Sequence, residues 1–212
     1  TGSLYKYGYI PQDEVDACRV AGLLGIGPKV FGASASETQD IYSGSLKGSD
    51  GKMQMQFLQG YGSSHAFPQI DQNVRDMRTI GMVKQLHDRG IYHGDLHTDN
   101  IMIRAGNGPE GATIDDMKII DFGKAGHDPA GVLRELCGQD TSWHGGRLKT
   151  IAEDHGEGEA MDSLQAKYLA EAQKEKSPEE HQEDVTSFYS EMAEIFGRHG
   201  LSFEDEGGQE TS

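Results

Sequence analysis

The sequence has few cysteines. Cys18 and Cys137 are the only two in 212 residues, and they lack the short paired spacing of a zinc site. Two isolated cysteines also cannot build a disulfide framework, so a small secreted domain held by disulfides is excluded. A reducing compartment is the simpler location for such a chain.

Long apolar runs and positive charge are scarce as well. No run approaches the roughly 20 residues of a membrane span and no signal peptide is recognisable, so we expect no membrane span. The chain has 19 Lys and Arg residues against 35 Asp and Glu residues, a net charge of -16. Phosphate surfaces repel a chain of this charge without a local basic patch, so we expect no nucleic-acid partner.

What is present is enough apolar sequence for one core, or for one core with a small second lobe. Hydrophobic residues make up 35% of the 212 positions, which does not predict disorder for the chain as a whole. There are 29 glycines, and many fall between apolar runs, where turns and helix ends use them. We therefore expect a globular fold with generous loops.

The first 60 residues predict a small sheet with one helix. Met53, Met55 and Phe57 alternate with the residues between them, which indicates a strand with one buried face. A loop at 60–64 separates this part from the remainder. The expected strands are 3–10, 29–32, 40–42 and 52–59, and the expected helix is 13–24.

The remainder of the chain predicts mainly helices. Asp71 is a candidate N-cap for a helix that stops at Gly90. A second start signal, at 177–180, combines a Ser N-cap, a Pro at the first helical position and a capping-box Glu. Between these helices we expect further helix over 147–176, interrupted at 155–158.

Two extended segments in the middle of the chain predict a hairpin. They are 91–104 and 117–120, and a glycine-rich loop at 105–116 joins them. At the far end, the acidic tail 203–212 has the composition of a disordered segment.

The hairpin carries the densest pattern in the sequence. Tyr92-His-Gly-Asp95-Leu-His-Thr-Asp-Asn100 is followed by Lys118-Ile-Ile-Asp121-Phe-Gly123. These motifs resemble the protein-kinase superfamily, whose catalytic loop carries Asp and, five positions on, Asn, and whose magnesium loop is Asp-Phe-Gly. The 26 positions from Asp95 to Asp121 exceed the usual interval, but the excess falls in the hairpin loop, where insertion costs little.

The resemblance implies an α+β, bilobal protein-kinase-like fold. A reduced, β-rich N-lobe would occupy residues 1–60, and a mainly helical C-lobe with both motifs would occupy 61–202. No glycine-rich phosphate-covering loop precedes the first strand, so either the first two strands of the small lobe are missing here or the enzyme works without them. Gly94 replaces the usual Arg and no Ala-Pro-Glu follows, so control by activation-loop phosphorylation is not expected.

The resemblance also implies the chemistry of the site. ATP would be the phosphate donor, and Mg²⁺, or Mn²⁺, would be held by oxygen atoms of Asn100 and Asp121. Asp95 would orient the acceptor hydroxyl and take its proton late in the transfer. His97 stands where Ser/Thr kinases carry Lys, so it is either a hydrogen-bond donor to the transferred phosphate or a brace of the loop.

Further site residues follow from the same alignment. Lys6 falls on the strand of the phosphate-binding lysine and Glu14 on the helix of its glutamate partner. A solvated surface position is the alternative for Lys6, and Asp13 and Asp16 compete with Glu14. The residues whose backbone would hold the adenine are Phe57, Leu58 and Gln59.

For three further side chains, His93, Trp143 and His144, we expect supporting roles around the site. His93 is expected to hold the loop backbone instead of reacting. Trp143 and His144 are candidates for closing the substrate face, with a place in the core as the alternative for the tryptophan.

Three functions remain open at this stage. Size, acidity and missing control elements favour a compact Ser/Thr protein kinase, similar to those that bacteria inject as effectors, acting on a protein in the cytoplasm or in a host cytosol. The His-Gly-Asp-Leu-His motif and the lack of a peptide platform favour a small-molecule or phosphoinositide kinase instead. The missing glycine loop favours a pseudokinase binding module, although the presence of Asp95, Asn100 and Asp121 disfavours it.

Overall fold

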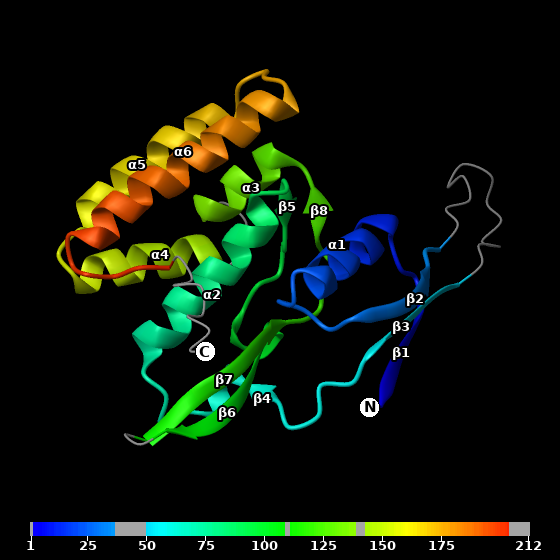
Figure 1. The fold of residues 1–212 in the computed structure, drawn as a ribbon. Helices are drawn as coiled ribbons and strands as arrows, with labels where there is room; N and C mark the ends of the chain where they lie inside the picture. Colours follow the sequence, from blue (N-terminus) through cyan, green and yellow to red (C-terminus); the bar gives the residue numbers. More distant parts are fainter. Residues whose placement is uncertain (1, 37–49, 109–110, 139–142, 204–212) are drawn as a thin grey trace, which may run out of the picture.

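The computed structural model of the chain describes residues 2–36, 50–108, 111–138 and 143–203. Two groups of elements lie side by side, a three-stranded sheet with one helix and a larger group of helices (Figure 1). This arrangement agrees with the expected α+β, bilobal fold, in which a β-rich part precedes a mainly helical one. The predicted boundary at residue 60 falls in the connection that follows the last strand of the sheet.

The smaller lobe is built on an antiparallel sheet with the strand order β1-β3-β2. One helix, α1 (Gln12–Leu23), packs beside it, and the buried Val15 of this helix shares a core with Met53 of the sheet. The strands are β1 (Ser3–Gly8), β2 (Val30–Ser34) and β3 (Gly51–Gln56). The strand predicted at 40–42 lies outside the described residues.

The alternation predicted for residues 52–59 holds only in its first half. Met53 is fully buried and Met55 is half-buried, but Phe57 is 54% exposed. The reason is that β3 ends at Gln56, after which Gln59 donates its N–H to the carbonyl of Phe57 and the chain turns. The buried face of the strand therefore stops before Phe57.

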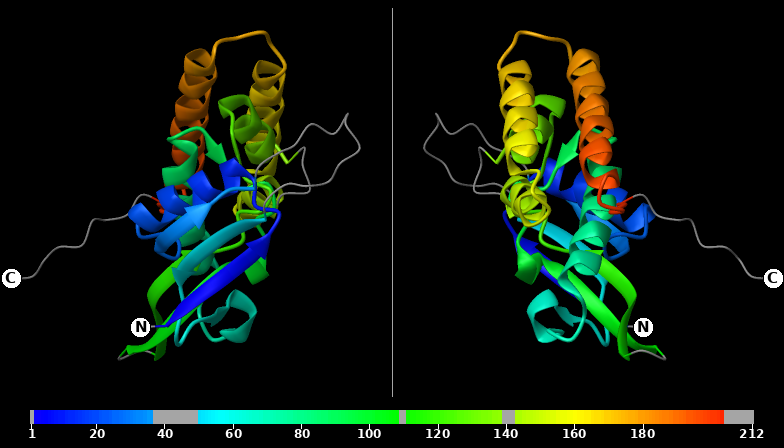
Figure 2. Two further views of the ribbon diagram at one scale, coloured as in Figure 1. Left: turned by 90° about the vertical axis from the view of Figure 1, so that its right-hand side faces the viewer. Right: turned by 90° about the vertical axis from the view of Figure 1, so that its left-hand side faces the viewer.

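The larger lobe is helical, and its apolar faces meet in a core that includes Phe188, Tyr189 and Phe196. The last two helices stand side by side and are joined by a turn at one end of the molecule (Figure 2). The helices are α2 (Gln72–His87), α3 (Pro129–Leu136), α4 (Trp143–Asp154), α5 (Gly158–Ala172) and α6 (Pro178–Gly197).

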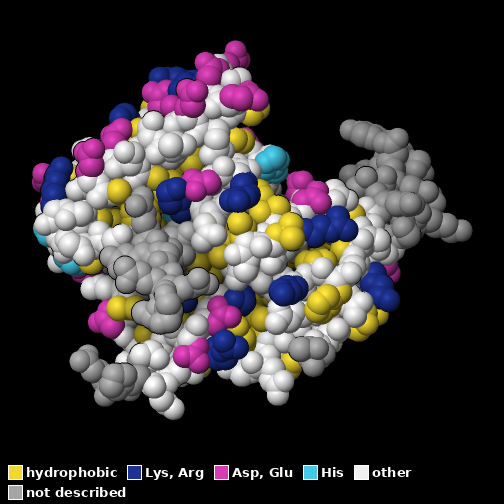
Figure 3. Space-filling view, viewed as in Figure 1, with side chains coloured by type: hydrophobic (Ala, Val, Ile, Leu, Met, Phe, Trp, Pro, Cys, Tyr) yellow, Lys and Arg dark blue, Asp and Glu magenta, His cyan; other side chains and the backbone are white. Residues whose placement is uncertain are grey.

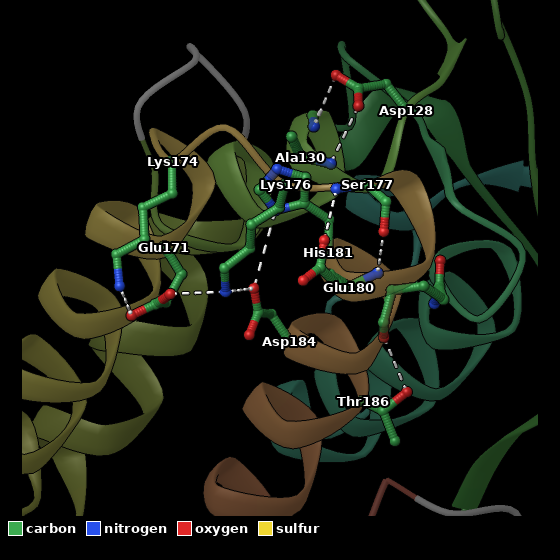
Figure 4. Close-up of polar contacts among 12 residues, drawn as sticks. Asp128, Ala130, Glu171, Lys174, Lys176, Ser177, Glu180, His181, Asp184 and Thr186 are labelled. Atoms are coloured by element: carbon green, nitrogen blue, oxygen red, sulfur yellow. Dashed lines mark hydrogen bonds and ion pairs between the residues drawn. The ribbon is translucent and has the colours of Figure 1, made fainter.

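Both predicted helix starts are confirmed. The Asp71 side chain accepts a hydrogen bond from the first turn of α2. At the start of α6, Ser177 Oγ accepts from the Glu180 N–H at 3.2 Å, while the Glu180 carboxylate accepts from the Ser177 N–H at 2.8 Å (Figure 4). This reciprocal pair satisfies two helix-end donors that would otherwise need water.

The turn between α5 and α6 is held by ion pairs. Lys176 Nζ lies 2.7 Å from Glu171 and 2.6 Å from Asp184, so one ammonium group joins the end of α5 to α6 (Figure 4). Acidic side chains gather over this end of the molecule (Figure 3).

The predicted hairpin forms, but its loop is much shorter than expected. Strands β6 (Ile101–Gly108) and β7 (Gly111–Ile119) pair along nearly their whole lengths, so residues 105–116 are mostly strand. Glycines suggested a loop there, whereas the β-branched Thr113 and Ile114 favour extended backbone and have cross-strand partners. A two-residue strand, β4 (Gly62–Ser63), adds to the outer edge of β6.

The disordered tail predicted for 203–212 is wrong at its first residue. Phe203 is 5% exposed and its ring lies 5.9 Å from the ring of Tyr189 in the helical core, because a large apolar side chain gains free energy on burial. The remainder, 204–212, lies outside the described residues. Across the described ranges no helix is both long and apolar enough to cross a membrane. Both cysteines are free thiols.

Candidate active site

The two motifs of the hairpin lie next to each other. The Asp-His-Asn segment runs from β5 (Ile91–Tyr92) through the 3-10 helix η3 (Thr98–Asn100) into β6, and the Asp-Phe-Gly segment leads from β7 to β8 (Gly126–His127). Strands β5 and β8 pair with each other, as do β6 and β7. The start of the first segment therefore lies beside the end of the second, and the end of the first lies beside the start of the second. The N–H of Ile120 donates to the carbonyl of Asn100 at 2.9 Å. The two loops are thereby joined main chain to main chain.

Asp121 has an unusual backbone conformation. Its φ of 60° places it in the left-handed region, and it is the only residue other than glycine with a positive φ in the described ranges. Such a conformation costs about 1 kcal/mol or more and persists where its surroundings fix it. It turns the half-exposed carboxylate toward the small lobe, where Oδ1 lies 4.0 Å from Lys6 Nζ.

Lys6 and Glu14 form the ion pair that the alignment predicts. Lys6 Nζ lies 2.5 Å from Glu14 Oε1, so β1 and α1 are tied together beside Asp121. The Glu14 side chain is only 4% exposed, and a buried carboxylate needs such a partner. Asp13 and Asp16, its competitors in the sequence, are both exposed.

The buried Asn100 is fixed by its side-chain amide. Its Nδ2 donates to the carbonyl of Asp95 at 2.9 Å, which leaves the amide oxygen as the atom that can contact a cation. In the described residues, no cluster of three or more His, Cys, Asp or Glu side chains could hold a metal by itself. A cation at Asn100 and Asp121 would therefore need further oxygen ligands, and phosphate groups can supply these.

Asp95 has a partner that the sequence did not predict. Its Oδ1 lies 3.0 Å from Nζ of Lys124, which directly follows the Asp-Phe-Gly motif. The two segments can approach because Gly94 has no side chain and a φ of 75°. A Cβ at this position would lie 2.3 Å from the carbonyl oxygen of Lys124, which is too close for any other residue.

His97 caps the short helix η3 instead of pointing at an acceptor. Its Nδ1 lies 3.3 Å from the N–H of Asp99, and its Nε2 lies 3.1 Å from Nδ2 of Asn100. Both ring nitrogens thus face donors of the same loop. Of the two expectations for His97, this geometry favours the brace over the phosphate donor.

His93 holds the loop backbone, as expected. It is fully buried, its Nε2 lies 3.0 Å from the carbonyl of Ile120, and its Nδ1 accepts from the N–H of Asp95 at 3.3 Å. Its ring also packs 4.9 Å from the ring of Phe122. Burial lowers the pKa of His93, so the ring is neutral and can accept the hydrogen bond from Asp95.

Glu135 of α3 organises the same loop and was missed by the sequence analysis. Its carboxylate accepts the N–H groups of His93 and Gly94 at 3.1 and 3.0 Å and contacts His87 Nε2 at 2.9 Å. Burial would raise the pKa of Glu135, but the hydrogen bond and charge of His87 outweigh this effect and lower it to about 2. The one available signal was a carboxylate on a helix whose neighbouring residues are apolar.

His144 lies at the start of α4 and does not close a substrate face, because it is fully buried and its ring meets the ring of His87 edge-on at 5.5 Å. Trp143 is partly buried against the core of the small lobe and catalytic loop, and its main-chain N–H donates to the carbonyl of Leu96. This packing favours the core position for the tryptophan, and its place at a substrate face stays a prediction.

The segment expected to hold an adenine is partly exposed. Phe57 donates its N–H to the carbonyl of Gly2 at 3.0 Å, and Gln59 donates to the carbonyl of Phe57 at 3.1 Å. Leu58 accepts from the N–H of Tyr61 at 3.4 Å. A nucleotide base would have to use the remaining backbone groups or exchange with these bonds, so the adenine site stays a prediction.

Comparisons with known proteins agree with the motifs. A model described as the lipopolysaccharide kinase (Kdo/WaaP) family matches residues 55–131, which contain both loops. The EKC/KEOPS complex subunit bud32 of Aspergillus oryzae is 45% identical over 56 residues, which are 24% of this chain and 21% of that protein. The match thus spans about a fifth of the length of the curated relative.

A solved structure shows a more distant likeness. The Cydia pomonella granulovirus kinase PK-1 is 13% identical, with 59% of this chain and 44% of that chain covered and a TM-score of 0.37. A TM-score this low does not by itself establish a shared fold. The segment that contains both loops is thus similar to the lipopolysaccharide kinase (Kdo/WaaP) family, which agrees with the resemblance of the two motifs to protein kinases.

Proposed function

We propose that the chain transfers the terminal phosphoryl group of ATP to an alcohol group. The observation that supports this most is the Lys6–Glu14 ion pair, whose ammonium also lies 4.0 Å from Asp121. A binding module has no chemical need for a buried carboxylate that holds a lysine beside a second carboxylate. An enzyme that binds phosphates needs such a fixed ammonium.

The donor set fits a hard divalent cation, Mg²⁺ or Mn²⁺. Carboxylate and amide oxygens are the ligands that such ions prefer, and Asp121 and Asn100 provide one of each kind. Bound with ATP, the cation would neutralise phosphate charge during the transfer. Lys6 would hold the phosphates from the side of the small lobe.

Asp95 would act on the acceptor. In the transfer, the bond between the terminal phosphorus and its bridging oxygen breaks, and that oxygen leaves with the electron pair as part of ADP. A new bond forms between the phosphorus and the acceptor hydroxyl oxygen, whose proton passes to the Asp95 carboxylate. His93 and Asn100 would hold Asp95 through the hydrogen bonds to its N–H and its carbonyl.

For the acceptor we propose a Ser or Thr residue of a protein, in a compact kinase of the type that bacteria inject as effectors. A sugar hydroxyl is the second candidate, because the matching family model is described as a lipopolysaccharide kinase family. The two acceptors need the same transfer chemistry. They differ in what must fit next to Asp95.

Labelling with [γ-³²P]ATP and Mg²⁺ tests the proposal, with a cell lysate in one arm and purified lipopolysaccharide in the other. Asp121→Asn should lower labelling at least about a hundredfold, because the ligand that holds the cation loses its negative charge. The matched control is Asp162→Asn, an exposed carboxylate paired with Lys149 on the helical lobe.

A labelled protein band supports the protein kinase, whereas label confined to lipopolysaccharide supports the sugar kinase. Absence of label in both arms, together with an unchanged melting temperature in ATP and Mg²⁺, overturns the enzyme and favours a scaffold.

A further inference from the structure

The catalytic loop of this chain lacks a lysine, because His97 stands at the usual place. The ring nitrogens of His97 face Asp99 and Asn100 of its own loop at 3.3 and 3.1 Å. Nδ1 accepts the hydrogen bond from Asp99, and Nε2 is turned toward the Asn100 amide, so both nitrogens are directed at the loop itself. In this orientation His97 does not take the place of the missing lysine.

Among the described residues of the small lobe, Lys6 is the lysine whose ion pairs place it beside Asp121, and Glu14 already pairs with it. Lys6 lies 2.5 Å from Glu14 and 4.0 Å from Asp121. The Lys6 ammonium is thus shared between two carboxylates, and the divalent cation would be held on Asp121 and Asn100. A further positive group on the Asp95 side of the site would stabilise the charge of the transferred phosphate.

Lys124 is placed to be that group. Its Nζ lies 3.0 Å from Asp95 Oδ1, and its side chain is 63% exposed. An ion pair this exposed is held by no more than about 1 kcal/mol, so its ammonium can change partner when a stronger anion arrives. Asp95, by contrast, is held through its main chain by His93 and Asn100.

The backbone of Lys124 is fixed even though its side chain is exposed. The absence of a side chain at Gly94 lets the Lys124 carbonyl pack against the loop, where a Cβ would lie at 2.3 Å. The N–H of the next residue, Ala125, donates to the carbonyl of Phe122 at 3.0 Å. Because the main chain of Lys124 is fixed and its ammonium group is exposed, the ammonium can reach two nearby anions from one backbone position.

We propose that Lys124 is a catalytic residue that contacts the terminal phosphate of ATP, and that it leaves Asp95 to do so. The inference rests on the proposed function. Before the nucleotide binds, the ammonium neutralises the Asp95 carboxylate. When the terminal phosphate arrives, the ammonium moves to its oxygens, and Asp95 becomes available for the proton of the acceptor hydroxyl.

Calorimetric titration with two nucleotides tests this directly. The Mg²⁺ complex of the non-hydrolysable analogue AMP-PNP carries the terminal phosphate, and that of ADP does not. Lys124→Met should weaken AMP-PNP binding about tenfold, as expected for the loss of one charged hydrogen bond. It should leave ADP binding within about twofold, whereas Lys124→Arg should keep most of the AMP-PNP affinity.

The matched control is Lys149→Met. Lys149 is also an exposed lysine paired with a carboxylate, at 2.7 Å from Asp162, but it lies on the helical lobe. This variant should bind both nucleotides as the unmodified chain does. An additional single-turnover measurement with ATP should show slower transfer for Lys124→Met even when nucleotide is saturating.

Each remaining outcome contradicts a distinct claim. If Lys124→Met binds AMP-PNP as tightly as the unmodified chain, or loses affinity for both nucleotides equally, the role of Lys124 is wrong while the proposed function stands. If the unmodified chain binds neither nucleotide, the proposed function fails and the inference fails with it.

Discussion

Two carboxylates of the catalytic site, Glu135 and Asp95, have opposite surroundings. Glu135 is 1% exposed and binds main-chain N–H groups and His87, whereas the Asp95 side chain is 33% exposed and pairs with an even more exposed Lys124. A buried partner cannot be replaced by water, but an exposed one can. The comparison teaches that Glu135 maintains the shape of the loop, and that Asp95 keeps a partner it can exchange.

Removing the buried carboxylate should have the largest effect. Glu135→Ala leaves two loop N–H groups and His87 without their acceptor, so the free energy of unfolding should fall by about 3–5 kcal/mol. Urea unfolding followed by circular dichroism measures this. Glu153→Ala is the control, because that carboxylate is half-exposed on α4 and its loss should cost less than about 0.5 kcal/mol. Equal losses in both variants would contradict the structural role of Glu135.

Acid should weaken the same buried region. Burial is the main reason that the pKa of His144 is lowered to about 3 from its ordinary 6.5, so the unfolded chain binds a proton that the folded chain does not. Stability therefore decreases as the pH falls below 6.5, by about 1.4 kcal/mol per pH unit for this histidine. Glu135, with a pKa of about 2, adds its own loss only below its ordinary value of 4.5.

Urea unfolding at several pH values between 7 and 4 measures the slope. Replacing the ionisable ring with an apolar one, in His144→Phe, should flatten it. A slope that this variant leaves unchanged would show that other groups cause the acid sensitivity.

The Lys6–Glu14 pair lies between the two extremes. Lys6→Met leaves the nearly buried Glu14 carboxylate without its ammonium, so we expect a loss of about 1–3 kcal/mol. The double variant Lys6→Met with Glu14→Gln should regain most of this loss, because a neutral amide tolerates burial better. Additive losses in the unfolding free energies would show that the two residues do not interact.

The exposed pair should have the smallest effect on stability. Lys124→Met should change the free energy of unfolding by less than about 1 kcal/mol, because solvent screens the ion pair with Asp95. The measurement is again urea unfolding, in low and in high salt. A loss as large as that of Glu135→Ala would remove the distinction between the two carboxylates.

The sequence predicted that its two motifs lie together, because a hairpin of strand, loop and strand brings their ends to one place. The catalytic and metal-binding roles of Asp95, Asn100 and Asp121 stay a proposal. The Lys6–Glu14 pair followed from alignment, although only its burial separated Glu14 from its acidic neighbours.

Other features depend on tertiary packing that no local pattern shows. The function of Glu135 depends on which helix face meets the catalytic loop, and an isolated Glu among Val132, Leu133 and Leu136 was the only hint. The orientation of His97 depends on the turn that follows it. The length of the hairpin was underestimated because cross-strand pairing overrides the local preference of glycine for loops.

Because β6 and β7 pair along nearly their whole lengths, the number of residues between the two motifs does not determine where the motifs lie. One end of the hairpin carries Asn100 and the strand that leads to Asp121, while the other end lies at the edge of the molecule (Figure 1). Residues inserted between Gly108 and Gly111 would thus lengthen the interval between the motifs without displacing either. A fluorophore or an affinity tag attached at the end of the hairpin marked by Gly108 and Gly111 should therefore leave both loops in position.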